Sequence, residues 1–386
     1  MNTEGKILVH CDLDAFFAAV ETLHSGLDPS VPLIIGADPK GGRGRGIVST
    51  CNYAARAYGV RSAMPISEAW RRCPASPAGP ATYVRGSYRL YSRASKRVMA
   101  VLREAGGPFE QASIDEAYLD VTEATGGDWD QALALCEQMQ RNIEEVTGLT
   151  ASFGLGPTRI LAKMGSEERK PQGLFRLMPG DALEFFVGRS LREVPGIGPA
   201  TATAMQEWGV QTVDEAYDLG ELALARMVGE RFAGWLMAVV EERTSDDVSV
   251  LRSRKSIGKE TTFERDQRDE EQVLEHLLAL VDQVMARATE LGVVGRLGEV
   301  KIRYQGFDTR THRRSIPVAM DDSTVFRSLA SKLFATSLER ERPVRLVGFR
   351  LGDLEDPPTR QVTLQRFESA SSETVHGRED GPEGLD

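Results

Sequence analysis

The sequence predicts an α+β protein of several domains, because the chain is long and its pattern changes near residue 171. With 386 residues, it exceeds what one ordinary core holds. Before Pro171, short apolar strands alternate with helices. Residues 181–242 have an all-helical pattern, and residues 256–352 follow the order strand, helix, strand, strand, helix, strand. We therefore expect a mixed domain, a helical domain and a small α+β domain.

The elements of the first region follow from their apolar runs and turn residues. Residues 6–13 form an apolar run that ends in acidic residues, which predicts a buried strand. The glycine-rich stretch 41–46 fits no nucleotide-binding motif, so a flexible turn is expected there. Further strands are expected at 31–36, 46–50, 109–113, 117–121 and 150–155, and helices at 52–58, 66–71, 87–104, 130–145 and 159–166.

The net charge of −10 argues at first against a nucleic-acid partner. From Leu351 onward, however, nine acidic and three basic residues carry −6 of it, which leaves −4 for the body. A single basic cluster is usually a solvated face, but several of them favour a surface for phosphates. The clusters are Arg252, Arg254, Lys255 and Lys259; Lys301, Arg303, Arg310, Arg313 and Arg314; and Arg85, Arg89, Arg93 and Arg97.

Several classes of protein are disfavoured by what the sequence lacks. No run of about 18 apolar residues is present, so no membrane span is expected. Residues 1–14 do not form a signal peptide, so a cytoplasmic protein is expected. Four cysteines lack metal-ligand spacing, which favours reduced cysteines that pack as small hydrophobes over a zinc site or disulfides.

Acidic residues end two of the apolar strands. Asp12 and Asp14 close the first strand, and Asp115 and Glu116 separate two later ones. A buried carboxylate costs several kcal/mol unless a cation or hydrogen bonds compensate. Oxygen ligands in such places favour magnesium, and two ions roughly 3.5–4 Å apart would serve phosphoryl transfer. The alternative is that these are hydrophilic strand ends facing water.

Six short segments, in order, resemble the Y-family DNA polymerases, specifically the bacterial DinB or DNA polymerase IV type. Each is weak to moderate alone, but six in order between residues 6 and about 350 are specific. The segments are HCDLDAFF at 10–17, NYAAR at 52–56, SIDEAYLD at 113–120, KPQG at 170–173, VPGIG at 194–198 and KSIG at 255–258.

The resemblance implies a right-hand polymerase fold with an α+β palm, small fingers, a helical thumb and an α+β little finger. The boundaries that it implies are palm 1–19 and 78–169, fingers 20–77, thumb 170–243, linker 244–255 and little finger 256–352. The implied activity is template-directed DNA synthesis that extends a primer past damaged bases, with low fidelity. No acidic group is left over for a proofreading exonuclease.

The resemblance also implies the residues of the active site. Asp12, Asp115 and Glu116, with the backbone carbonyl of Leu13, would hold two Mg²⁺ ions. Asp14 is not assigned to a metal, and a role at a helix N-terminus is equally open. The implied nucleotide contacts are Phe16, Phe17, Ser49, Thr50, Tyr53, Arg56 and Lys170.

Two groups of these contacts have alternatives. Phe17 matches the steric gate that leaves no room for a ribose 2′-hydroxyl, but it could instead be a core aromatic residue. Tyr53, Arg56 and Lys170 would hold the triphosphate, and the alternative is ordinary polar surface. Ser49 and Thr50 are small residues that would pack against the nascent base pair.

The partners implied are primer–template DNA and deoxynucleoside triphosphates, bound by a monomer. Gly196 and Gly198 lie in a helix-hairpin-helix turn whose backbone N–H groups would approach a phosphate, with a poorer copy at 228–230. A plain connection between helices is the alternative. The other implied DNA contacts are Arg254, Lys255, Ser256, Lys301 and Arg303.

The tail at 353–386 is acidic and rich in Pro, Ser and Gly, so disorder is expected. Within it, Gln361, Leu364 and Phe367 resemble a peptide that binds the sliding clamp. The alternative is a last strand that packs on the little finger.

Two other functions compete with the polymerase. A nucleotide cyclase can use a similar palm with two metal-binding carboxylates, although it would not need a DNA grip. A non-catalytic adaptor would have lost metal ligands, whereas Asp12, Asp115 and Glu116 are all present.

Overall fold

The computed structural model describes residues 5–244, 247–248 and 254–357. The chain divides into two compact units, Met1–Arg252 and Ser253–Asp386, and each is described by itself. Within the described ranges, no helix is both long and apolar enough to cross a membrane.

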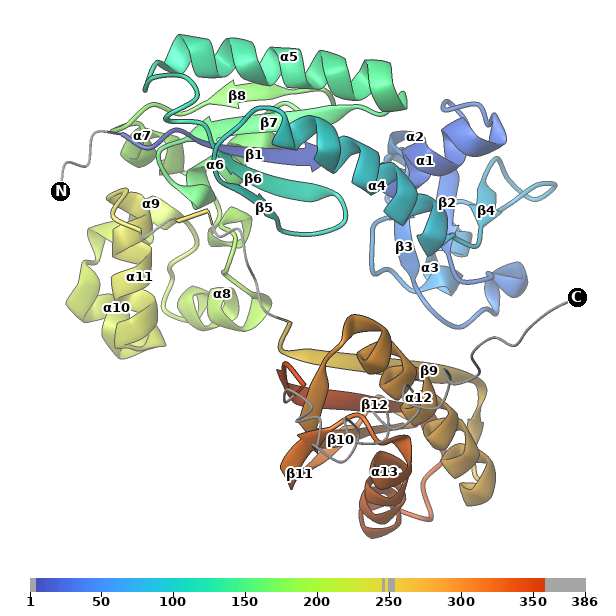
Figure 1. Ribbon diagram of the computed structural model, residues 1–386. Coiled ribbons are helices and arrows are strands. Elements are labelled where there is room, and N and C mark those ends of the chain that lie inside the picture. The colour runs from blue at the N-terminus through green and yellow to red at the C-terminus, as the bar shows by residue number, and fades with distance from the viewer. Residues whose placement is uncertain (1–4, 245–246, 249–253, 358–386) are drawn as a thin grey trace, which may run out of the picture. The chain divides into compact units, whose positions relative to one another are not determined.

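A five-stranded sheet organises the first unit, in the order β5-β6-β1-β7-β8 (Figure 1). Its central strand β1 pairs antiparallel with both β6 and β7. Only β7 and β8 pair in parallel within this sheet. The strands are β1 (Leu8–Leu13), β5 (Phe109–Gln111), β6 (Glu116–Asp120), β7 (Ala151–Gly156) and β8 (Leu174–Arg176).

Helices cover both faces of this sheet (Figure 1). Val9, Cys11 and Leu13 of β1 pack into one core with residues of α1 (Phe16–Ser25), α4 (Tyr88–Arg103) and α5 (Trp129–Thr147). On the other face, Leu8 packs with Ala162 of α6 (Arg159–Glu168). Because side chains alternate along a strand, His10 and Asp12 share the α6 face with Leu8.

A three-stranded sheet, β3-β2-β4, forms a separate small core in the same unit. Its connection to α2 depends on Asn52, whose side-chain oxygen accepts hydrogen bonds from Ala55 N and Leu33 N, each at 3.0 Å. The elements are β2 (Leu33–Gly36), η1 (Lys40–Gly42), β3 (Val48–Cys51), α2 (Tyr53–Ala57), α3 (Ile66–Arg72) and β4 (Thr82–Val84).

The remainder of the first unit is helical around its own core, as the sequence predicted for residues 181–242. Gly229, at φ 90, separates α10 from α11, where the poorer hairpin copy was predicted. The elements are α7 (Ala182–Phe186), η2 (Leu191–Glu193), α8 (Pro199–Gln206), α9 (Val213–Asp218), α10 (Glu221–Val228) and α11 (Glu230–Val240).

The second unit is an antiparallel sheet, β11-β10-β12-β9, with two helices packed against it. The predicted order of strands and helices is confirmed. The elements are β9 (Ser256–Gln267), α12 (Glu270–Leu291), β10 (Val294–Tyr304), β11 (Thr309–Met320), α13 (Ser323–Ser337) and β12 (Val344–Glu355).

The structure contains elements that the sequence analysis did not predict. Helix α1 and the strands β4 and β8 were not predicted. Strand β4 pairs with β2 although it lies beyond the fingers boundary at 77, and β8 pairs with β7 although it follows the thumb boundary at 170. Strand β12 continues to Glu355, three residues into the predicted tail. A three-residue strand is too short to show a sequence pattern of its own and forms because a distant strand pairs with it. Local sequence patterns therefore do not predict such a strand.

All four cysteines, Cys11, Cys51, Cys73 and Cys136, are free and buried. The interpretation as small hydrophobic residues is therefore confirmed.

Candidate active site

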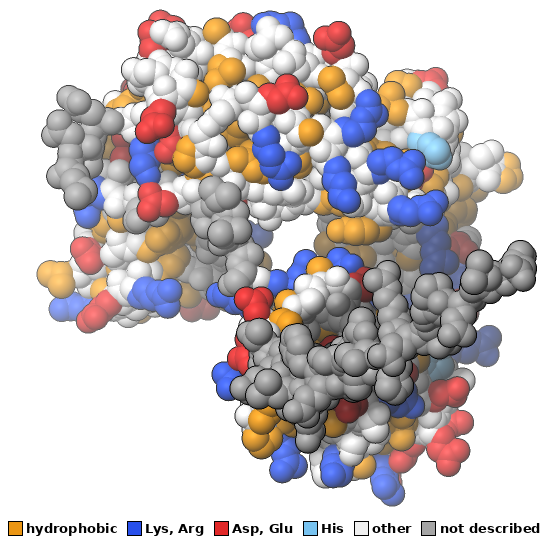
Figure 2. All heavy atoms as spheres, in the orientation of Figure 1, with side chains coloured by type: hydrophobic (Ala, Val, Ile, Leu, Met, Phe, Trp, Pro, Cys, Tyr) orange, Lys and Arg blue, Asp and Glu red, His pale blue; other side chains and the backbone are white. Residues whose placement is uncertain are grey.

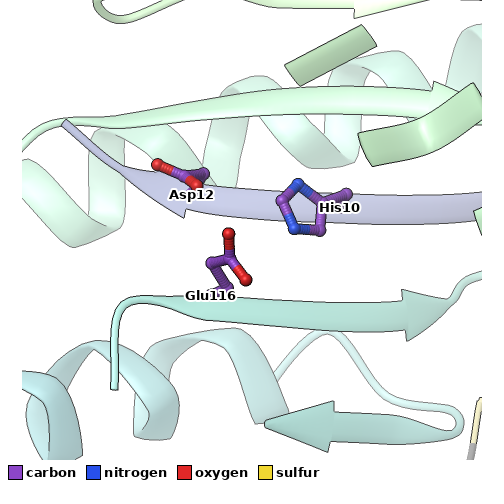
Figure 3. Close-up of side chains that lie close together, drawn as sticks. All are labelled: His10, Asp12 and Glu116. Carbon is purple, nitrogen blue, oxygen red and sulfur yellow. The ribbon is translucent and has the colours of Figure 1, made fainter. Parts of the chain in front are cut away.

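The sheet places two predicted metal ligands opposite each other. Asp12 and Glu116 are partners in the antiparallel register of β1 and β6. His10 lies two residues before Asp12, so it shares the same face of β1. Figure 3 shows Glu116 pointing from β6 toward Asp12 and His10 on β1, and each of the three offers a ligand atom within 4.8 Å of the others.

Two lysine ammonium groups lie against these carboxylates. Lys170 Nζ is 2.6 Å from Asp12 Oδ1 and 2.6 Å from Glu167 Oε1. Lys163 Nζ is 2.5 Å from Glu116 Oε1. Burial raises the pKa of Asp12 to about 7, Lys170 opposes that rise, and the nearby carboxylates of Glu167 and Glu116 add to it. The site thus concentrates negative charge and attracts cations, which fits a hard divalent ion with oxygen ligands.

Asp115 is adjacent to this group but is held differently. Ser113 Oγ donates to Asp115 Oδ1 at 2.5 Å and accepts from the backbone N of Asp115 and Glu116. The carbonyl of Asp115 accepts from Leu13 N at 3.0 Å, which attaches the hairpin tip to the end of β1. The structure therefore brings Asp12 and Glu116 together and places Asp115 beside them, with its carboxylate hydrogen-bonded to Ser113.

His10 was missed by the sequence analysis. It is fully buried, its Nδ1 is 2.7 Å from Ser166 Oγ, and its Nε2 is 3.5 Å from Lys163 Nζ. Burial, with Lys163 adding to it, lowers the pKa of His10 well below 6.5, so the ring is neutral at pH 7. The sequence could have indicated His10, because a residue two positions before Asp12 on a strand must lie on the same face as Asp12.

Asp14 directly precedes α1, where the helix N-terminal role left open for it stays a prediction, but it is not the N-cap residue. Ala15 occupies the N-cap position of α1, and no side chain caps that helix. The buried Asp14 carboxylate instead accepts hydrogen bonds from Thr150 Oγ1 (2.8 Å), Ser152 Oγ (2.8 Å) and Gln172 N (2.9 Å). Asp14 thereby ties β1 to β7 and to the loop that carries Lys170.

Tyr53 and Arg56 project from α2 as a pair. The Arg56 guanidinium lies 4.6 Å from the centre of the Tyr53 ring. Burial raises the pKa of Tyr53, and the charges of Asp14, Arg56, Lys170 and Asp12 also act on it, so the phenol lies near the acidic site. Among the predicted base-pair contacts on β3, Ser49 is exposed and Thr50 is half-buried.

Phe17 stacks on Tyr91 with ring centres 4.1 Å apart and an interplanar angle of 11°. Phe17 remains partly exposed, whereas Phe16 is only 3% exposed and belongs to the core. The Phe16 ring is thus enclosed by protein, and the nucleotide contact expected of this residue stays a prediction. Tyr91 is itself fixed, since its hydroxyl donates to Glu21 Oε1 at 2.5 Å.

The predicted helix-hairpin-helix turn has the backbone that such a turn needs. Gly196 has φ 106, and a Cβ there would lie 3.2 Å from the Trp235 ring, so a side chain is disfavoured on both counts. Gly198 is exposed and serves as the N-cap of α8, with Pro199 as the first helical residue. The N–H groups at the start of α8 are therefore presented at the surface.

In the second unit, Lys301 and Arg303 lie on β10 between the buried residues Val300, Ile302 and Tyr304. They therefore point away from the core. Lys301 Nζ is paired with Glu260 Oε2 at 2.7 Å, and Arg303 Nε donates to Thr309 Oγ1 at 2.8 Å. The predicted contacts Arg254 and Lys255 are exposed, and Ser256 begins β9.

The predicted arginine row is confirmed as a surface feature. Arg85 precedes α4, while Arg89, Arg93 and Arg97 are exposed on it. Figure 2 shows basic side chains gathered along this helix. The clamp-motif residues Gln361, Leu364 and Phe367 lie outside the described residues.

Known proteins match both units. The impB/mucB/samB family matches residues 11–167, and the C-terminal domain of the same family matches residues 254–364. The chain is 38% identical to a DNA polymerase IV of Methanoculleus marisnigri, an alignment that covers 95% of this chain and 99% of that protein. It is 36% identical to a DNA polymerase IV of Streptococcus suis, over 90% of this chain and 96% of the relative.

Solved structures match as well. A chimera of the Y-family DNA polymerases Dbh and Dpo4 superposes with a TM-score of 0.82 at 28% identity, over 91% of this chain and all of that one. An insertion ternary complex of Dbh DNA polymerase gives a TM-score of 0.65 at 26% identity, over 91% of this chain and 100% of that one.

The chain therefore belongs to the impB/mucB/samB family, the Y-family DNA polymerases. Within that family it is of the DNA polymerase IV type, a DNA-directed DNA polymerase of translesion synthesis that uses divalent metal ions. The nucleotide cyclase and the non-catalytic adaptor are set aside by this assignment.

Proposed function

We propose that Asp12, Asp115 and Glu116 hold two Mg²⁺ ions and that this group performs nucleotidyl transfer from a deoxynucleoside triphosphate to a primer. The observation that carries the proposal is the register pair Asp12–Glu116, which places two carboxylates side by side at the end of a buried strand. The backbone carbonyl of Leu13, the residue that follows Asp12 on β1, is proposed as a further ligand.

When bound, the metal ions would supply activation of the primer hydroxyl and stabilisation of the leaving pyrophosphate. The protein's own contribution is to hold the carboxylates at fixed positions. The β1–β6 register fixes Asp12 and Glu116. Ser113 fixes Asp115 through two hydrogen bonds and accepts a third from the backbone N of Glu116. Such fixed charges need little reorganisation during the reaction.

Lys170, Tyr53 and Arg56 form the triphosphate side of the proposed site. Lys170 reaches Asp12 from the loop that Asp14 anchors, so its ammonium lies where a phosphate beside the metals would be. Phe17 is proposed to exclude ribonucleotides, supported by its fixed stacking on Tyr91. Phe16 would contribute only through its backbone, and Ser49 and Thr50 would face the base pair.

Primer–template DNA is the proposed partner of both units. The backbone N–H groups at Gly196 and Gly198 and the basic residues Arg254, Lys255, Ser256, Lys301 and Arg303 would contact phosphates. Because Lys301 is paired with Glu260, its charge is available only when that ion pair opens. We propose further that the protein is a cytoplasmic monomer of low fidelity without proofreading, and that Gln361, Leu364 and Phe367 bind the sliding clamp.

Primer extension with Mg²⁺ on undamaged and damaged templates tests the proposal. Asp115→Ala and Glu116→Gln should each abolish extension while DNA binding is retained. Glu123→Gln, an exposed acidic residue close in sequence, serves as the matched control and should extend normally. Near-normal extension by Asp115→Ala or Glu116→Gln would show that the assignment of the carboxylates is wrong.

A further inference from the structure

Lys163 lies beside the acidic site without belonging to any role assigned so far. It projects from α6 on the face of the sheet that carries Asp12 and His10. Its Nζ is 2.5 Å from Glu116 Oε1 and 3.5 Å from His10 Nε2. The side chains of Lys163 and Glu116 are 26% and 27% exposed, so the ion pair is partly screened from water.

The backbone that carries Lys163 is held tightly against the sheet. A Cβ at Gly154 of β7 would meet Ala162 O at 2.0 Å and Ser166 N at 2.2 Å. Helix α6 therefore packs directly on the strand backbone, and only glycine permits this approach. Thr158 caps the helix by accepting from Leu161 N, so the start of α6 is fixed as well.

The hydrogen-bond donors around His10 determine which ring nitrogen carries the proton. Ser166 has one hydroxyl hydrogen, and it donates to Lys163 O at 2.7 Å. The 2.7 Å contact between Ser166 Oγ and His10 Nδ1 must then be donated by the ring, which places the proton on Nδ1. A lysine ammonium has only donors, so in the 3.5 Å contact with Lys163 Nζ the Nε2 atom is the acceptor.

We infer that Lys163, oriented by the Nε2 lone pair of His10, is a positioning residue that holds Glu116 in the orientation needed for nucleotidyl transfer. The inference rests on the proposed function, because it requires Glu116 to act in the site. A carboxylate has two oxygens, and Lys163 fixes one of them, Oε1. The other oxygen is thereby directed rather than free to rotate. Partners of this kind change activity by about 10–100-fold when removed.

Because Lys163 is charged, its removal should change metal binding in a way that the removal of a purely structural residue would not. As a cation beside Glu116, Lys163 competes with a divalent ion for the same carboxylate. Its removal should make Mn²⁺ bind to the free protein at least as tightly as before, while extension becomes slower. Loss of folding would instead weaken both Mn²⁺ binding and primer extension.

The test compares Lys163→Met with the parent protein and with Lys332→Met, an exposed lysine of α13 as the matched control. Single-turnover primer extension should fall about 10–100-fold in Lys163→Met, with the thermal unfolding midpoint and DNA binding retained. Free Mn²⁺, measured by electron paramagnetic resonance with protein alone, should show equal or tighter binding. Lys163→Arg should recover part of the extension rate, because it keeps a donor and a charge. A parent-like rate in Lys163→Met overturns the inference, and so does weaker Mn²⁺ binding.

The His10 part is tested without a substitution. ¹⁵N chemical shifts of the imidazole nitrogens in ¹⁵N-histidine-labelled protein should show a protonated Nδ1 and an unprotonated Nε2 for His10. A protonated Nε2 overturns the proposed orientation of Lys163. If Glu116→Gln keeps near-normal extension, the proposed function itself has failed. If Glu116→Gln is inactive and Lys163→Met is parent-like, only the present inference has failed.

Discussion

Replacing Asp14 by alanine should destabilise the first unit, although Asp14 lies only two residues from Asp12. The buried carboxylate accepts from Thr150, Ser152 and Gln172 N, and it joins β1, β7 and the Lys170 loop. Each hydrogen bond to a charged acceptor contributes about 1.5–3 kcal/mol, and Thr150 can be partly compensated by water. The Ser152 bond is buried and the other two are partly buried, so counting the first in full and the others at about half predicts a loss of about 3–6 kcal/mol. For a unit of this size, that lowers the unfolding midpoint by about 10 °C or more.

Asp12→Ala is the informative comparison. Burial raises the pKa of Asp12 to about 7, which means that its charged form is unfavourable in the metal-free fold. Asp12→Ala should therefore abolish extension with little loss of stability, or with a small gain. Asp14→Ala should instead lower the stability of the fold. It should also raise the KM for the incoming nucleotide, because the hydrogen bond from Gln172 N that anchors the Lys170 loop is lost.

Thermal unfolding followed by circular dichroism or calorimetry, without added metal, measures the stability difference. Asp14→Asn keeps one acceptor oxygen and should lose about half as much as Asp14→Ala. Steady-state kinetics at saturating primer–template give the KM for the nucleotide. The reasoning would be refuted if Asp14→Ala unfolded within about 2 °C of the parent, because the buried bonds would then contribute almost nothing.

Four further outcomes are expected. Phe17→Ala should admit ribonucleotides far more readily with a smaller change in deoxynucleotide use, and an unchanged sugar preference would mean that another residue forms the wall. Asp12, whose pKa is raised to about 7, must lose its proton to bind a cation. The extension rate at limiting Mg²⁺ should therefore fall by up to about tenfold for each pH unit below about 7, and a higher Mg²⁺ concentration should shift this pH profile to lower pH. A pH profile that does not depend on the Mg²⁺ concentration would contradict this. By the same raised pKa, the metal-free protein should lose stability as the pH rises from about 4 to 7, and a stability that rose with pH over that range would count against the raised pKa. Combined Gln361→Ala, Leu364→Ala and Phe367→Ala should remove stimulation by loaded clamp on long primed DNA, and full stimulation would reject the motif; a loss of thermal stability would favour a strand on the little finger instead.

The sequence by itself determined the order of the main elements and the identity of two acidic segments. Periodicity sufficed for residues 6–13, 130–145 and 256–352, because long amphipathic helices and continuous apolar strands carry their signal locally. The family resemblance rested on short motifs such as SIDEAYLD at 113–120, whose residues are neighbours in the chain.

Only the tertiary structure showed which groups each acidic residue contacts. Asp12 and Asp14 are two residues apart, so both lie on the same side of the chain as it leaves β1, and their spacing alone cannot distinguish them. Their partners come from more than 130 positions away: Lys170 for Asp12, and Thr150, Ser152 and Gln172 for Asp14. The sequence analysis did not find His10 and Lys163 for the same reason, since α6 contacts β1 only when the sheet has formed. Contacts set by the packing of remote elements leave no periodic trace in the residues that make them.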